Sequence, residues 1–124
     1  MYPYCYAVSL RIWHPGVDAQ VVADTLGLAS HPTAPSVQSF WRHQYDVPQD
    51  GECAAFIAAA AAALQPHAAF FEQLRSAGGR AEFFIGWFGD KNFGDTFRHT
   101  TLALLAELRI DVSVDVYPDA AQNT

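Results

Sequence analysis

The chain has 124 residues, of which 51% are hydrophobic and 16% charged, and its formal net charge is −6. This length and composition predict one folded domain over residues 1–124 and exclude a disordered chain. Thirteen acidic side chains outweigh seven basic ones, and no run of lysine or arginine interrupts the acidity. Nucleic acid and anionic membranes are therefore excluded as expected partners, because both repel an acidic surface.

The sequence contains no segment that predicts export or membrane insertion. Residues 1–10 lack the positive segment and the small-residue cleavage site of a secretory signal. The longest apolar run, Cys53 to Leu64, is shorter than a bilayer requires. Cys5 and Cys53 are isolated in the sequence, which favours two free thiols over a disulfide. We therefore expect a soluble, cytoplasmic protein.

The N-terminal residues predict a strand followed by a short helix. Residues 4–13 alternate between two faces, as a half-buried strand does. His14-Pro15-Gly16 interrupts this pattern, Asp18 is placed to cap a helix, and Gly27 is placed to end it. One face of the strand carries Tyr4, Tyr6, Val8, Leu10 and Ile12, and the other carries Cys5, Ala7, Ser9, Arg11 and Trp13.

The middle of the chain predicts a loop over 28–38, a strand over 40–47 and then a broken helix. Asp50 is a plausible N-cap for a helix that runs through the alanine tract to Leu64. Pro66 begins a second helical piece, because proline is tolerated in a first turn and not in a helix interior.

The C-terminal third predicts a strand, a helix and a last strand. Gly78-Gly79 ends the preceding helix, and the strand covers 80–88. Asp95 is placed to cap the next helix. The last strand covers 110–117, with Ile110, Val112, Val114 and Val116 directed inward.

The expected fold is α+β, with the element order β-α-β-α(broken)-β-α-β. Because each strand alternates, we predict a four-stranded, largely antiparallel or mixed sheet with helices packed on one face. Residues 118–124 are expected to form a frayed tail.

The face of the sheet without helices is the candidate binding surface. Aromatic rings mixed with a few charges are typical of recognition surfaces. The alternative is that the middle helix covers Phe84 and Phe88 as a second core layer, with a salt bridge such as Arg11 to Asp115 at its margin. The candidate binding residues are Arg11, Trp13, Glu82, Phe84, Phe88, Asp115 and Tyr117.

No pattern in the sequence predicts catalysis, a metal or a cofactor. The five histidines lie in different elements and lack the spacing of metal ligands. Cys53 has acidic neighbours that oppose a thiolate. Asp90 and Asp95 are the carboxylate pair considered for acid–base catalysis, but turn formation and helix capping explain both residues more simply.

Landmarks along the chain are the strand ending at Trp13, Leu26-Gly27-Leu28, Pro32-Thr33, Trp41, Leu64-Gln65-Pro66, the aromatic strand around Trp87, and Leu108 to Tyr117. Together these landmarks resemble a bacterial domain-of-unknown-function family, number 4279. The resemblance covers most of the chain, although the Lys-Gly pair expected after Pro32-Thr33 is replaced by Ala34-Pro35-Ser36. Since the family has no known activity, the resemblance implies only a small bacterial α/β protein.

These observations favour a non-enzymatic protein-binding module. By analogy with other small acidic bacterial proteins, its partner would be a basic toxin to which it confers immunity. One alternative is a small-ligand binder or enzyme with a pocket near His31, Arg42 and His43. Another is a homodimer that associates through the open face of the sheet.

Overall fold

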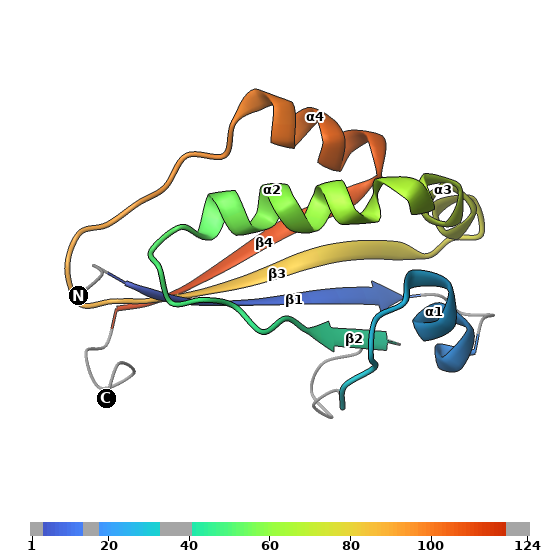
Figure 1. The fold of residues 1–124 in the computed structure, drawn as a ribbon, viewed down its shortest axis with the longest axis horizontal. Helices are drawn as coiled ribbons and strands as arrows, with labels where there is room; N and C mark the ends of the chain where they lie inside the picture. Colours follow the sequence, from blue (N-terminus) through green and yellow to red (C-terminus); the bar gives the residue numbers. More distant parts are fainter. Residues whose placement is uncertain (1–3, 14–17, 33–40, 119–124) are drawn as a thin grey trace.

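The strands form one mixed sheet in the computed structural model, which describes residues 4–13, 18–32 and 41–118 (Figure 1). The strand order is β2-β1-β3-β4. β1 is antiparallel to both β2 and β3, whereas β3 and β4 are parallel. The predicted α+β class is confirmed, and of the two predicted sheet types the sheet is the mixed one. The strands are β1 Cys5–Trp13, β2 Trp41–Gln44, β3 Arg80–Phe88 and β4 Ile110–Tyr117.

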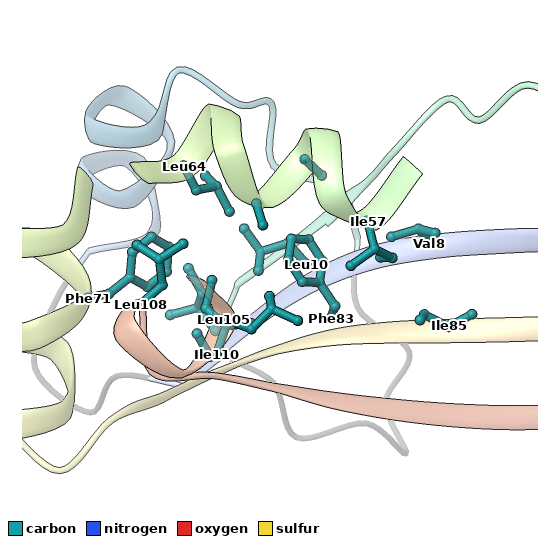
Figure 2. Packing of buried hydrophobic residues seen from close by; sticks show 14 of the residues in the cluster. Val8, Leu10, Ile57, Leu64, Phe71, Phe83, Ile85, Leu105, Leu108 and Ile110 are labelled. Carbon is teal, nitrogen blue, oxygen red and sulfur yellow. The ribbon is translucent and has the colours of Figure 1, made fainter. Parts of the chain in front are cut away.

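The large helices lie over one face of this sheet (Figure 1). The side chains of Val8, Leu10, Phe83 and Ile85 point toward them and meet Ile57 in the core (Figure 2). Because these residues alternate along β1 and β3, the other side chains of both strands are left on the opposite face. The helices are α1 Ala19–Leu26, α2 Cys53–Leu64, the 3₁₀ turn η1 Gln65–His67, α3 Ala68–Ser76 and α4 His99–Glu107.

Capping residues mark both ends of α1, and a close backbone contact requires glycine after α3. The Asp18 side chain accepts a hydrogen bond from the backbone of Gln20 at 2.9 Å, which confirms the predicted cap. Gly27 takes the left-handed conformation that ends α1, with φ of 67°. A Cβ atom on Gly79 would collide with the carbonyl oxygen of Trp13, so only glycine fits where α3 returns to the sheet.

The second strand ends earlier than predicted. A side chain makes the hydrogen bonds to β1 that the end of the predicted strand was expected to make. β2 ends at Gln44, although Tyr45 still donates a backbone hydrogen bond to Val8. Beyond it, the Gln49 amide both accepts from the backbone nitrogen of Tyr6 and donates to its carbonyl, each at 3.1 Å. Gln49 thus satisfies the edge of β1 where the strand over 40–47 was expected to continue.

The broken helix forms one helical stretch of 24 residues, Cys53–Ser76. By length and composition alone, this stretch is apolar enough to cross a membrane, which the predicted alanine helix was not. The η1 turn contains Pro66 and redirects the chain between α2 and α3 (Figure 1). Inward side chains such as Ile57, Leu64 and Phe71 are buried in the core, as in the central helix of a globular domain.

The inward face of β4 is largely uncovered, contrary to the prediction. Ile110 is buried beneath α4, but Val112, Val114 and Val116 are 38%, 40% and 56% exposed. Their pairing with Phe83, Ile85 and Trp87 places them on the helix side of the sheet, as predicted. Their exposure means that the described helices leave this part of β4 uncovered.

Some predictions concern residues that the structure does not describe. They are the break at His14-Pro15-Gly16, residues 33–38 of the predicted loop, Phe40 at the start of the predicted second strand, and residues 119–124 of the predicted tail.

Candidate functional site

All seven predicted binding residues lie on the sheet face opposite the helices. Arg11 pairs across the sheet with Glu82, and Trp13 pairs with Arg80. Phe88 pairs with Tyr117 on β4, two residues beyond the pair of Gly86 and Asp115. The middle helix packs on the other face of the sheet, so the alternative in which it covers Phe84 and Phe88 is wrong.

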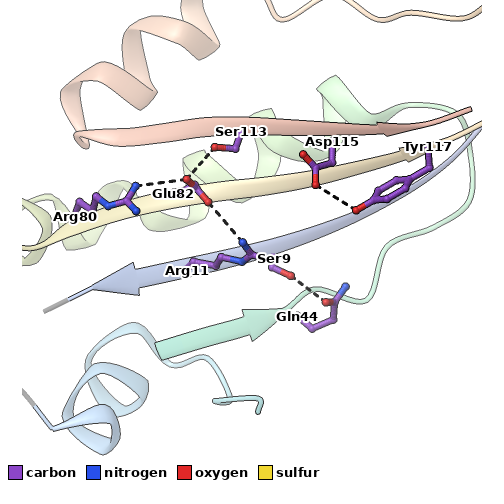
Figure 3. Close-up of polar contacts among 8 residues, drawn as sticks. All are labelled: Ser9, Arg11, Gln44, Arg80, Glu82, Ser113, Asp115 and Tyr117. Atoms are coloured by element: carbon purple, nitrogen blue, oxygen red, sulfur yellow. Dashed lines mark hydrogen bonds and ion pairs between the residues drawn. The ribbon is translucent and has the colours of Figure 1, made fainter. Parts of the chain in front are cut away.

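Glu82 is the centre of a polar network on this face (Figure 3). Its carboxylate lies 4.0 Å from the Arg11 guanidinium and 3.7 Å from that of Arg80. It also accepts a hydrogen bond from the Ser113 hydroxyl at 2.9 Å. Glu82 is only 8% exposed, and this burial is tolerated because two guanidinium groups balance the charge and one hydroxyl donates to it. Arg11 therefore pairs with Glu82, and not with Asp115, the partner that the second-core-layer alternative gave as an example.

The aromatic rings of the face are covered by neighbouring side chains of the same face. The Arg11 guanidinium lies 3.8 Å from the centre of the Phe84 ring. Arg80 lies at the same distance over Trp13, and Phe88 stacks on Tyr117 with centroids 4.8 Å apart. Phe84, Trp13 and Phe88 are half-buried for this reason, so the face is a preformed surface in which flat rings carry fixed charges.

Charge is distributed unevenly across the open face. Arg42 lies on its β2 side, where it donates to the carbonyl of Pro32 at 3.0 Å. Asp111 and Asp115 lie on its β4 side, and within residues 4–13, 18–32 and 41–118 neither pairs with a lysine or arginine. Among the described residues, Asp115 accepts a side-chain hydrogen bond only from the Tyr117 hydroxyl, at 3.2 Å. The uncompensated negative charge of this face is therefore on β4.

The structure brings together two of the three residues of the small-ligand alternative, His31 and His43, whereas Arg42 lies on the opposite face of β2, across from Arg11. The rings of His31 and His43 are 5.2 Å apart. Their hydrogen bonds serve the chain itself: the backbone of Gln44 donates to His31 Nδ1 at 3.1 Å, and His43 Nδ1 donates to the carbonyl of Ala29 at 2.6 Å. Together with the Arg42 bond to Pro32, these contacts hold residues 29–32 against β2.

Sequence reasoning missed a groove of about 560 Å³ between α2 and α4. Asp95 lies at this groove. The sequence predicted that Asp95 would cap α4, but in the structure it caps α2. One of its oxygens accepts from the backbone of Ala54 at 2.8 Å and from the Tyr4 hydroxyl at 3.3 Å. α4 begins after Arg98 with no side-chain cap. The lining residues are Glu52, Ala54, Ala55, Ala58, Asp95, Thr96, Arg98 and Thr101.

Asp50, the cap predicted for α2, lies just before the helix. Its carboxylate accepts from the backbone of Glu52 and from the Tyr6 hydroxyl, both at 2.9 Å. Asp50 therefore shapes the turn that leads into α2, and Asp95 supplies the cap from a distant segment.

We expect Asp95→Ala to lower the free energy of unfolding by about 1–2 kcal/mol, because it removes both a helix cap and the partner of a buried tyrosine. Urea unfolding measures this loss. Asp90→Ala is the matched control, since Asp90 is an exposed aspartate in the same turn segment. If both changes cost the same, the capping bond from Asp95 to α2 is not formed.

The buried thiol lacks the properties of a nucleophile. Cys53 is fully buried, and this burial raises the pKa of its thiol to about 11. A catalytic cysteine needs the opposite shift, which favours the thiolate. Within the part of the chain that the structure describes, no group of three His, Cys, Asp or Glu side chains is placed to hold a metal.

Comparison with known proteins adds no further constraint. No family model matches this chain. No curated protein and no solved structure matches it either. The resemblance to family 4279 stays a prediction.

Proposed function

We propose that this chain is a non-enzymatic, cytoplasmic protein-binding module of bacterial origin that recognises a basic protein, such as a toxin, through its open sheet face. The observation that carries the proposal is the gathering of seven aromatic and charged residues on one face that no described helix covers. Membership of family 4279 is part of the same proposal.

The internal contacts of the face support a binding role. Arg11, Arg80 and Glu82 hold one another and the rings of Phe84 and Trp13 in place, so little side-chain entropy remains to be lost on binding. Flat rings of this kind supply contact area, and fixed charges determine orientation.

The charges of the face support a basic partner. Asp111 and Asp115 have no basic partner among the described residues, and the whole chain carries a net charge of −6. A positively charged surface placed over β4 would neutralise both aspartates and would be attracted from a distance.

The test is capture of a partner by the full chain, followed by comparison of matched variants. We expect a retained protein with an isoelectric point above about 9, and about tenfold weaker binding for Tyr117→Ser and for the double change Asp111→Asn with Asp115→Asn. Leu102→Ser is the control, because Leu102 is an exposed apolar residue on α4. An acidic partner, or binding that none of these changes weakens, contradicts the proposal.

The groove between α2 and α4 favours a second candidate function, the binding of a small molecule. Its lining combines the apolar residues Ala54 and Ala58 with the polar residues Arg98 and Thr101. A ligand there would contact Asp95, so it would raise the thermal midpoint of the wild-type chain more than that of Asp95→Ala. A fragment screen by thermal shift on both chains tests this candidate.

A further inference from the structure

The free edge of β4 combines two features that a single partner could satisfy. β4 is the last strand of the sheet order, and within residues 4–13, 18–32 and 41–118 it pairs only with β3. Its outer row of backbone N–H and C=O groups is therefore open to another strand. Its eight residues contain no lysine, arginine or proline, and the charges that protect this edge are the two aspartates, which disfavour an acidic strand and leave the edge open to a basic one.

The side chains of β4 form two different stripes along this edge. Val112, Val114 and Val116 project on the helix side and are 38–56% exposed, because no described helix covers them. Asp111 and Asp115 project on the open face. A strand laid beside β4 would thus meet an apolar row on one side of the sheet and two carboxylates on the other.

We propose that β4 binds its partner by strand addition, and that the added segment alternates apolar residues with lysine or arginine. Its apolar side chains would cover the valine row, and its basic side chains would lie beside Asp111 and Asp115 on the open face. This inference rests on the proposed function, because it identifies which part of a basic partner enters the open face and from which edge.

The charges of β4 argue against a second copy of this chain as the occupant. An antiparallel pair of β4 strands centred on Ser113 would place Asp111 directly opposite the partner copy's Asp115, where like charges repel. Centring the pair on Val114 aligns the valines but brings the two copies of Asp115 to diagonal positions. A basic strand avoids both conflicts.

The test uses the full chain and a capped synthetic peptide of about eight residues in which valine and lysine alternate. Hydrogen exchange of the β4 amides, followed by NMR, reports strand addition directly. We expect the peptide to slow exchange of the outward β4 amides by about tenfold or more, and its backbone N-methylated form to lose this effect. A peptide with glutamate in place of lysine should not bind.

Variants separate the edge from the rest of the surface. We expect Val114→Ser to weaken peptide binding by about tenfold, and Asp111→Asn with Asp115→Asn to weaken it and reduce its salt dependence. Leu102→Ser is again the matched control. Since Val114 is 40% exposed, Val114→Ser should remain folded, which circular dichroism verifies.

Several outcomes overturn the inference. One is equal binding of the glutamate peptide, and another is binding that Val114→Ser leaves unchanged. If the chain sediments as a dimer that Val114→Ser makes monomeric, the occupant is a second copy. If the partner captured by the full chain needs Tyr117 but not Val114, strand addition is wrong while the protein-binding proposal stands.

Discussion

Replacing Phe83 with alanine is expected to lower the free energy of unfolding by about 3–5 kcal/mol, whereas the same change at Phe84 should cost only about 1–2 kcal/mol. Phe83 is fully buried beneath the helices and packs near Tyr45 and the core of β1. Removing its ring leaves a cavity that the surrounding side chains fill only partly. The loss is a large fraction of the stability of a domain of this size.

The smaller loss at Phe84 follows from its position on the open face. The Phe84 ring is half-buried under the Arg11 guanidinium, so alanine removes one cation–π contact and some apolar surface but creates no enclosed cavity. Arg11 keeps its ion pair with Glu82 in this variant. Urea denaturation of both variants, followed by tryptophan fluorescence, measures the difference.

A third variant keeps the comparison informative if Phe83→Ala does not fold. Phe83→Leu retains most of the side-chain volume and should cost about 1–1.5 kcal/mol, which a folded chain tolerates. Equal losses for the alanine variants at 83 and 84 would mean that both faces of β3 are buried. The open face would then be a second core layer, and both binding proposals would fail.

Alternation of apolar and polar residues was enough to predict most of the sheet. β3 and β4 have the predicted bounds, and β1 begins one residue later than predicted. The period of two also assigned each candidate binding residue to the correct face, because a strand gives its side chains only two directions. The gathering of Arg11, Glu82 and Tyr117 on one surface was therefore predictable before any pairing of strands was known.

The errors arose where the outcome depends on residues far away in the sequence. Asp95 lies close to α4 in the chain, yet it caps α2, whose Ala54 is 41 positions away. Gln49 ends β2 early by bonding to Tyr6. Arg11 forms its ion pair with Glu82 and not with Asp115, because Glu82 is directly opposite Arg11 on the neighbouring strand. None of these choices has a local signal, since each is a competition between partners that only the fold brings together.

The exposure of the valine row has the same origin. The pattern of β4 correctly directs Val112 and Val114 to the helix side, but alternation says nothing about whether a helix is present there. Coverage depends on where α2 and α4 lie over the sheet (Figure 1). This difference between direction and burial is what makes the β4 edge a candidate binding surface.

Stability is expected to fall steeply as pH rises from about 9 to about 12, because the fold holds several acidic hydroxyl and thiol groups in their neutral forms. Burial raises the pKa of Cys53 from 9.0 to about 11. It also raises the pKa of Tyr4 and of Tyr45 from 10.0 to about 12, and that of Tyr6 well above its usual range. The unfolded chain therefore ionises at a lower pH than the folded one.

The direction of the effect follows from these raised values. Below about pH 9 both states are protonated at these groups and the stability is fully present. As pH rises, the unfolded state loses protons first, so stability decreases until the folded pKa values are passed. For Cys53 alone, a shift from 9.0 to about 11 corresponds to about 3 kcal/mol.

Urea midpoints measured across this pH range, with two matched pairs of variants, isolate the responsible groups. Cys53→Ala should flatten the decline between pH 9 and about 11, while Cys5→Ala should not, because Cys5 is exposed. Tyr45→Phe keeps the ring and removes only the hydroxyl, so it should flatten the decline between pH 10 and about 12. A profile that is the same for Cys53→Ala and Cys5→Ala would mean that the Cys53 thiol is open to solvent. The contacts of Asp95 and Tyr4 would then not hold the N-terminus of α2 against β1. The groove between α2 and α4 would therefore not have the lining described above.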